Sequence, residues 1–208
     1  MDQELDEGLP LRERKKRATR QRISDIATGL FVERGFDAVT VAEVARAAGV
    51  SAMTVFNYFP RKEDLFLDRI PQAAELFAEA VRDRAPGESP LAALRRLVLR
   101  LLDEGHPLSG VGEHYPHFYR VVIASPALRS RAREGVEEVE RALAAALAES
   151  GAADSRLLAA LTVAAYRTVF VTSAHRLLSG DPVDEVARDH RARLGVAFTA
   201  LERAGLDG

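Results

Sequence analysis

The segment from Thr40 to Phe59, TVAEVARAAGVSAMTVFNYF, constrains the fold of this chain more than any other. Thr40 and Glu43 have the spacing of a capping box, in which a hydroxyl and a carboxylate each accept from a backbone N–H at a helix start. Apolar residues then recur at helical spacing, and Gly49 stands where a helix ends in a left-handed backbone. Ser51 can cap the next helix. The segment predicts two short helices joined by a tight glycine turn.

The flanking residues extend this helical pattern on both sides. Upstream, Ile23, Ala27 and Phe31 recur at helical spacing and predict a first helix over residues 18–34. Downstream, Lys62 opens a fourth helix whose first turn is acidic, as the helix dipole favours. The sequence therefore predicts a three-helix domain with a helix-turn-helix over residues 18–67.

Together these motifs resemble the N-terminal domain of TetR-family transcriptional repressors. The resemblance rests on TRQRISDIATGLFVERGF, TVAEVARAAGVSAMTVFNYF and PRKEDLF in this order, and it covers about the first third of the chain. It implies an all-α fold, in which the N-terminal domain reads DNA as part of a repressor. The resemblance also implies that a larger helical ligand-binding and dimerisation domain follows over residues 68–208.

The resemblance also implies which side chains meet the DNA. Thr40 and Lys62 each begin a helix and are expected at phosphates, and Tyr58 matches a family position whose hydroxyl meets the DNA backbone. Asn57 can pair with adenine, and apolar side chains can contact a thymine methyl. Two alternatives stay open, since Thr40 can be a cap alone and Met53 a core residue. The full candidate set is Thr40, Ser51, Ala52, Met53, Thr54, Asn57, Tyr58, Lys62, Arg17 and Arg20.

The chain departs from its relatives within this set. Many relatives carry lysine and glycine where this chain has Ala52 and Met53, and an aromatic residue where it has Asn57. These departures imply a base preference of its own. Relatives also often have serine or asparagine where this chain has Arg61, which weakens the expected cap of the fourth helix.

Charge is segregated along the chain, although the net charge is only -2. We expect residues 1–17 to form a disordered arm, acidic at first and then basic. The basic residues in and after this arm are Arg12, Arg14, Lys15, Lys16, Arg17, Arg20 and Arg22. Such a segment can neutralise phosphates or enter a minor groove. The alternative is a solvated tail.

Composition narrows the protein class. The 208 residues are 47% hydrophobic, which supplies a large core, and include no cysteine for a disulfide or thiolate metal site. The first residues, MDQELDEGLP, are acidic and unlike a secretory signal, and no run of about 18 apolar residues is evident. We therefore expect a soluble, cytoplasmic protein without membrane association. No cofactor motif is present, so we expect no cofactor.

The remainder of the chain reads as helices. Pro71 is expected to end or kink the fourth helix, with a further helix from Gln72 to Arg84. The last two helices, about 154–178 and 183–204, carry more apolar surface than a solvated helix needs. The resemblance implies that they form a homodimer interface, so that two half-sites of a palindromic operator are read. The alternative is packing within one monomer.

The resemblance further implies a small-molecule effector that releases the repressor from DNA. Polar or aromatic side chains within apolar helices are the candidates for its site, namely His114, His117, Phe118, Tyr166, Arg167, Thr172 and His175. Arg167 and His175 can share one helix face, and a buried arginine there would favour an acidic effector. A salt bridge from Arg167 to Glu137, Glu138 or Glu140 is an equal alternative.

Other functions have weaker support in the sequence. His114 and His117 are three residues apart, but Pro116 lies between them, so we expect no metal site. A helical enzyme using His106, His114 and His117 lacks any nucleophile or phosphate-loop motif, so we expect no catalysis. A ligand-independent DNA-binding activator or organiser would use the same helix-turn-helix.

Overall fold

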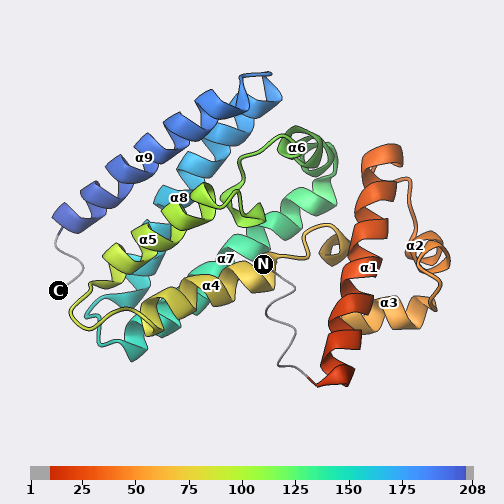
Figure 1. The fold of residues 1–208 in the computed structure, drawn as a ribbon, viewed down its shortest axis with the longest axis horizontal. Helices are drawn as coiled ribbons and strands as arrows, with labels where there is room; N and C mark the ends of the chain where they lie inside the picture. Colours follow the sequence, from red (N-terminus) through yellow and green to blue (C-terminus); the bar gives the residue numbers. More distant parts are fainter. Residues whose placement is uncertain (1–9, 205–208) are drawn as a thin grey trace. The chain divides into compact units, whose positions relative to one another are not determined.

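The protein is an all-α chain, as the sequence predicted. The computed structural model describes residues 10–204, which contain no β-strand (Figure 1). The helices are α1 (Leu11–Arg34), α2 (Val41–Ala47), α3 (Ala52–Tyr58), the 3-10 helix η2 (Lys62–Leu65), α4 (Ile70–Arg82), α5 (Pro90–Asp103), the 3-10 helix η3 (Pro107–Ser109), α6 (Tyr115–Ala124), α7 (Pro126–Glu149), α8 (Ser155–Leu178) and α9 (Val183–Arg203).

The chain divides into two compact units. The first unit holds the described residues up to Asp68 together with Ala124–Leu128, and the second holds Arg69–Ile123 and the residues from Arg129 onward. The chain therefore enters the first unit twice, the second time at the turn between α6 and α7.

The first unit is built around an aromatic centre. Phe31 is fully buried on α1, and its ring lies 4.9 Å from the ring of Phe36 and 5.9 Å from that of Phe66. Val44 on α2 and Val55 on α3 are also fully buried. These contacts fix the apolar faces of the short helices α2 and α3 against α1, and neither short helix could hold its conformation alone.

Helix α1 begins seven residues earlier than the sequence predicted. We expected a disordered arm over residues 1–17, but α1 starts at Leu11, with Pro10 at its N-cap. Residues 11–17, LRERKKR, are good helix formers, so a helix with little burial can extend through them. The prediction missed this because it took a charge run for a tail. The acidic residues 2–7 lie outside the described residues.

The expected fourth helix is also different. Residues 62–65 form one 3-10 turn, and a new helix, α4, begins at Ile70 with Pro71 in its first turn. Proline lacks only an N–H that a helix start leaves unbonded, so Pro71 starts this helix and does not end one.

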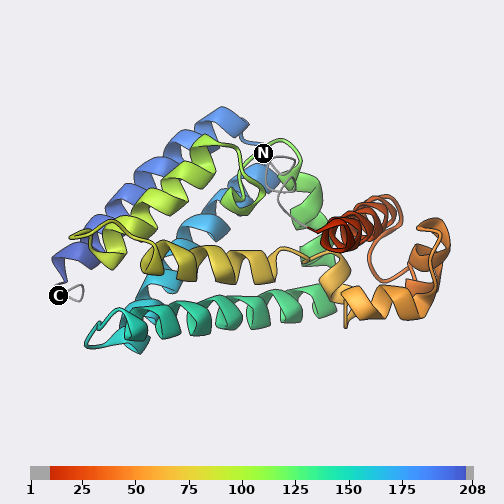
Figure 2. The same cartoon turned by 60° about the horizontal axis from the view of Figure 1, so that its bottom comes forward.

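The second unit has a larger aliphatic core, to which α4, α5, α7, α8 and α9 contribute. Helix α9 packs along α8 and α5, and Figures 1 and 2 both show this side-by-side arrangement. Among the described helices, α8 alone is long and apolar enough to cross a membrane by length and composition, but core helices of soluble proteins share these properties. Many α8 residues lie in the core, including Leu158 and Val169.

Candidate functional site

The α2–turn–α3 segment is held by hydrogen bonds between residues three apart. The Thr40 backbone N–H donates to Glu43 Oε2 at 2.8 Å, and the Glu43 N–H donates to Thr40 Oγ1 at 3.2 Å. At the start of α3, the Thr54 N–H donates to Ser51 Oγ at 3.0 Å. Gly49 has a φ of 65°, as the tight turn requires. The predicted capping box, glycine turn and second cap are all present.

Glu43 is the most perturbed carboxylate of this segment. The Thr40 backbone hydrogen bond, together with the Arg34 guanidinium 2.7 Å away, lowers the pKa of Glu43 to about 2. Glu43 thus stays ionised at neutral pH and links the end of α1 to the start of α2.

Helix α3 presents a polar and apolar face to solvent. Ala52, Met53 and Asn57 are exposed, and Met53 is 70% exposed, so it is not a core residue. Thr54 and Tyr58 are half-buried. Phe56 is 46% exposed on the same short helix, and the sequence reasoning did not include it. Its spacing from Ala52 and Met53, four and three residues, was the available signal.

Lys62 has a structural contact that the sequence did not indicate. Its Nζ donates to the Phe36 carbonyl at 2.6 Å and lies 4.2 Å from the centre of the Phe36 ring. Burial lowers the pKa of Lys62, while Asp37 and Glu63 act in the opposite direction. The ammonium group therefore holds the loop after α1 through the Phe36 carbonyl and ring. The phosphate contact that the sequence suggested for Lys62 stays a prediction.

Arg20 is held inside the first unit as well. Its guanidinium lies 4.7 Å from the centre of the Phe59 ring and donates to the Asp68 carbonyl at 2.8 Å. The Ser24 hydroxyl donates to the Asp68 carboxylate at 2.8 Å. Arg20 thus links α1 to the end of α3. The exposed basic residues in the first half of α1 are Arg12, Arg14, Lys15, Lys16, Arg17 and Arg22.

The predicted effector residues of the second unit do not form one site. Arg167 and His175 share a face of α8, as expected, but both are exposed, so the interpretation of Arg167 as a buried arginine is wrong. His114 and His117 are exposed as well. The Thr172 hydroxyl donates to the Thr168 carbonyl at 2.9 Å, a bond within its own helix. The prediction chose polar and aromatic side chains in an otherwise apolar helix, but Arg167 and His175 lie on a face of α8 that is exposed in the single chain.

Phe118 and Tyr166 do belong to one group, which we call the ring cluster. It joins six aromatic side chains from α4, α6 and α8, namely Phe77, Tyr115, Phe118, Tyr119, Tyr166 and Phe170. Successive ring centres lie 5.5 to 6.3 Å apart. Such edge-to-face and tilted contacts stabilise the pairs beyond the area they bury.

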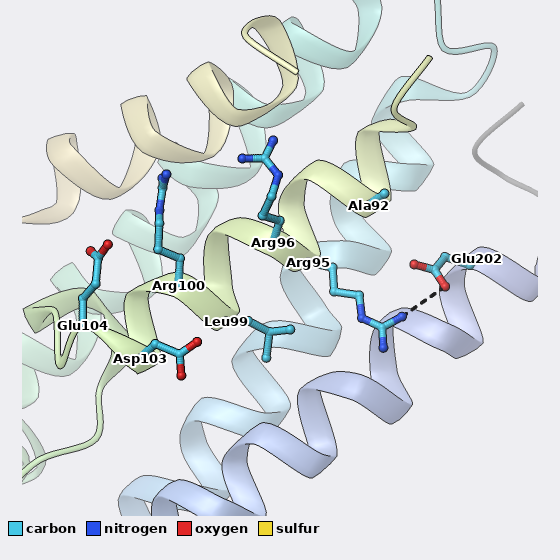
Figure 3. Close-up of a pocket in the computed structure, with 8 residues that line it drawn as sticks. All are labelled: Ala92, Arg95, Arg96, Leu99, Arg100, Asp103, Glu104 and Glu202. Carbon is cyan, nitrogen blue, oxygen red and sulfur yellow. Dashed lines mark hydrogen bonds and ion pairs between the residues drawn. The ribbon is translucent and has the colours of Figure 1, made fainter. Parts of the chain in front are cut away.

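A groove of about 600 Å³ lies between α5 and α9, away from all the predicted effector residues. Its charged lining residues are equal in number, three arginines (Arg95, Arg96, Arg100) and three acids (Asp103, Glu104, Glu202). Figure 3 shows Arg95 reaching from α5 towards Glu202 on α9, at 3.5 Å. The groove thus has no excess of either charge. Within residues 10–204, no group of three histidines and carboxylates is placed to hold a metal ion.

The exposed face of α8 carries a regular stripe. Its members are separated by alternating steps of four and three residues, and they are Leu157, Leu161, Ala164, Thr168, Val171 and His175. Leu157 is 45% exposed and Val171 42%. This α8 stripe has the spacing of a helix–helix packing seam, although it faces solvent in the single chain.

Comparison with known proteins gives matches over both parts of the chain. A family model described as "Bacterial regulatory proteins, tetR family" matches residues 23–68. The HTH-type transcriptional regulator TcmR of Streptomyces glaucescens is 35% identical over 145 residues, which are 68% of this chain and 64% of that protein. The fatty acid metabolism regulator protein of Bacillus subtilis is 30% identical over 100 residues, 46% of this chain and 52% of that protein. The chain thus spans less than two thirds of the length of these curated relatives.

Solved structures extend the likeness to nearly the whole chain. FadR of Thermus thermophilus, a TetR-family transcriptional repressor in complex with lauroyl-CoA, has a TM-score of 0.52 and 30% identity, covering 86% of this chain and 92% of that one. NalD of Pseudomonas aeruginosa, the secondary repressor of a multidrug efflux pump, has a TM-score of 0.58, with 88% of this chain and 96% of that one covered. At 20% identity, NalD shares the fold.

Proposed function

The chain belongs to the TetR family of bacterial regulatory proteins, and from this we propose that it is a cytoplasmic transcriptional repressor that binds a palindromic operator as a dimer. A small-molecule effector would release it. The observation that carries the proposal is the exposed face of α3, set on a helix whose start and preceding turn are fixed by caps.

This face suits the major groove of DNA. A single helix fits that groove, and Asn57 offers an amide that can pair with the edge of adenine. Ala52, Met53 and Phe56 offer apolar contacts to thymine methyl groups, and the half-buried Tyr58 can direct its hydroxyl to a phosphate. Because α3 is only seven residues long, one copy reads few base pairs, which favours two half-sites.

The test is a selection of bound DNA from a random pool with the purified protein, followed by two variants. An enriched inverted repeat supports α3 as the DNA-recognition helix, and the spacing of its half-sites gives the distance between the two copies of α3 in the dimer. Asn57→Ala should remove the preference for adenine at one position of the half-site, which corresponds to a loss of about 1–3 kcal/mol of discrimination against the other bases. Tyr58→Phe should weaken binding to all sequences alike. If both variants keep the affinity and preference of the wild type, α3 does not read DNA as proposed.

The basic start of α1 extends the proposed interface. Its exposed arginines and lysines lie on a helix, and so reach DNA from fixed positions. Replacing Lys15 and Lys16 with glutamine should reduce the salt dependence of binding by the number of phosphates lost. If the salt dependence of DNA binding is unchanged in this variant, Lys15 and Lys16 do not contact DNA phosphates.

The α8 stripe supports dimerisation through α8 and α9. Val196 on α9 is 72% exposed, so this second helix also has apolar surface without a partner in the single chain. Leu161→Glu should convert a dimer into a monomer in light scattering at micromolar concentration, with the helical circular dichroism retained. A wild-type protein that is already monomeric would overturn this part of the proposal.

Release by an effector has a physical route in the chain. Residues 124–128 join α6 to α7 yet belong to the first unit, where the Ser125 hydroxyl donates to the Asp37 carboxylate at 3.1 Å. Leu128 is fully buried. A ligand that favours one arrangement of α6 and α7 therefore acts on residues tied to the loop between α1 and α2. A protein that stays on its operator across an effector panel would be a ligand-independent organiser or activator.

A further inference from the structure

We propose that the ring cluster is a binding site for an uncharged, hydroxylated aromatic molecule. This molecule binds by displacing the segment 107–110, which we call the strap. Binding of this molecule does not depend on DNA. Only its role as the effector that releases the protein from the operator rests on the proposed function.

The ring cluster offers a continuous aromatic wall. Phe77 on α4 meets Tyr166 on α8 at 5.5 Å between ring centres, and Phe170 on α8 meets Tyr119 on α6 at 5.8 Å. The wall thus combines three helices that are distant in sequence. Planar ligands bind well to such walls, because ring faces and ring edges carry opposite partial charges.

The strap is attached to this wall by tyrosine hydroxyls. Tyr166 donates to the Leu108 carbonyl at 2.9 Å, and Tyr119 donates to the Gly110 carbonyl at 2.6 Å. Tyr115 donates to the Pro107 carbonyl. Three of the four tyrosines in the chain therefore bind one segment of four residues. Burial raises the pKa of Tyr119 and of Tyr166, so both hydroxyls keep their protons and remain donors.

The strap lies in direct contact with the wall. Gly110 has a φ of 72°, and a Cβ added there would clash with the Phe170 ring. The backbone of Gly110 therefore covers the Phe170 ring. A ligand that takes this place gains the ring contact that the strap gives up.

The charge of the surroundings defines the ligand class. Among residues 10–204, Arg131 is the single buried residue with a permanent charge, and its guanidinium pairs with Glu138 at 2.8 Å. Arg69 acts electrostatically on Tyr115, but among the described residues no cation is found to act on Tyr119 or Tyr166. A charged ligand beside these two tyrosines would lose its hydration without gaining a counter-ion, which is costly. The tyrosine hydroxyls and strap carbonyls that separate on binding need new partners, and hydroxyl groups on a ligand supply both donors and acceptors.

The first experiment is calorimetric titration of the purified protein, without DNA, with three matched compounds. These are 2-naphthol, its saturated counterpart decahydro-2-naphthol, and the anion 2-naphthoate. We expect 2-naphthol to bind at least tenfold more tightly than either of the others. The proposal would be overturned if 2-naphthol did not bind, or if either of the other two compounds bound with the same affinity as 2-naphthol.

The second experiment separates displacement of the strap from simple contact with a wall. Tyr119→Phe and Tyr166→Phe each keep the ring but remove one bond to the strap, so opening becomes easier and 2-naphthol should bind about 2- to 10-fold more tightly. Ser150→Ala removes a comparable hydroxyl–carbonyl bond at the end of α7, 2.8 Å long, and should leave the affinity unchanged. Unchanged or weaker binding by both tyrosine variants, with wild-type circular dichroism, would rule out the displacement.

DNA release distinguishes this inference from the proposed function. If 2-naphthol binds and releases the selected operator, both stand. If it binds and the operator stays bound, the site is supported and its role as effector site is rejected. If it does not bind while the operator is held, the inference fails and the DNA-binding function remains.

Discussion

The α2–turn–α3 segment is held by polar contacts between residues close in sequence, whereas polar contacts between helices of the second unit join residues far apart along the chain. In the first unit, the bonds that set α2 and α3 join residues three apart, such as Thr40 with Glu43. In the second unit, Tyr166 bonds a residue 58 positions away, and Arg95 pairs with Glu202, 107 positions away. Local bonds fix where a short helix begins, while its packing on the aromatic centre keeps it folded. Long-range bonds join segments that a ligand can separate.

The largest effect on stability is expected when the strap is forced off the ring cluster. Gly110→Ala places a methyl group on Phe170 at a positive φ, and should lower the free energy of unfolding by about 2 to 4 kcal/mol. Gly87→Ala is the matched control. It has a φ of 80° and no described atom within 4 Å of the added Cβ, so only the backbone cost of about 1–2 kcal/mol remains. Urea unfolding monitored by circular dichroism measures the free energy of unfolding of both variants. If both lose the same amount, the contact between the strap and Phe170 does not contribute to stability.

Lowering the pH should affect the stability of the two units over different pH ranges. Burial lowers the pKa of His190 to about 4, and its ring shares a 2.9 Å hydrogen bond with Ser173 between α8 and α9. The stability from a neutral His190 is present above the unfolded pKa near 6.5 and is lost as the pH falls towards 4. For Glu43, whose pKa is lowered from 4.5 to about 2, the stability is present above 4.5 and is lost as the pH falls towards 2.

The second unit should therefore weaken at a higher pH than the first. Urea midpoints at pH 7, 5 and 3 measure this, with tyrosine emission reporting mainly the second unit. His190→Gln should flatten the change between pH 7 and 5, whereas Glu43→Gln should flatten only the change below it. A wild-type midpoint that is constant from pH 7 to 5 contradicts the assignment to His190.

The smallest effect belongs to a single local bond. Thr40→Ala removes the hydroxyl that accepts from the Glu43 N–H, and should cost about 1 kcal/mol of stability in the first unit. Thr40→Ser keeps the acceptor and should restore most of that loss. If DNA affinity falls in Thr40→Ala by much more than stability, Thr40 also touches the DNA and is more than a cap.

The same difference in range explains what could be predicted from sequence. The capping box, Gly49 and the Ser51 cap were predictable because each motif lies within a few residues. The positions of Lys62 over Phe36 and of Arg20 over Phe59 were not, because they depend on how distant segments pack. Both side chains looked like free cations in the sequence.

The second unit shows this limit more strongly. The last two helices were predictable from periodicity, and α8 and α9 lie within a residue of the predicted ranges 154–178 and 183–204. Which face of α8 is buried was not predictable, because apolar residues occupy most of its circumference. Arg167 and His175 were therefore interpreted as lining a pocket, and the ring cluster was found only in part, through Phe118 and Tyr166.

The return of the chain to the first unit at residues 124–128 limits how this protein can be recombined. A chimera that joins the first 68 residues to the body of another regulator would leave out Ser125, which bonds Asp37, and the fully buried Leu128. A functional exchange of specificity must therefore carry two separate pieces of sequence. The two units are compact, but they are not interchangeable modules.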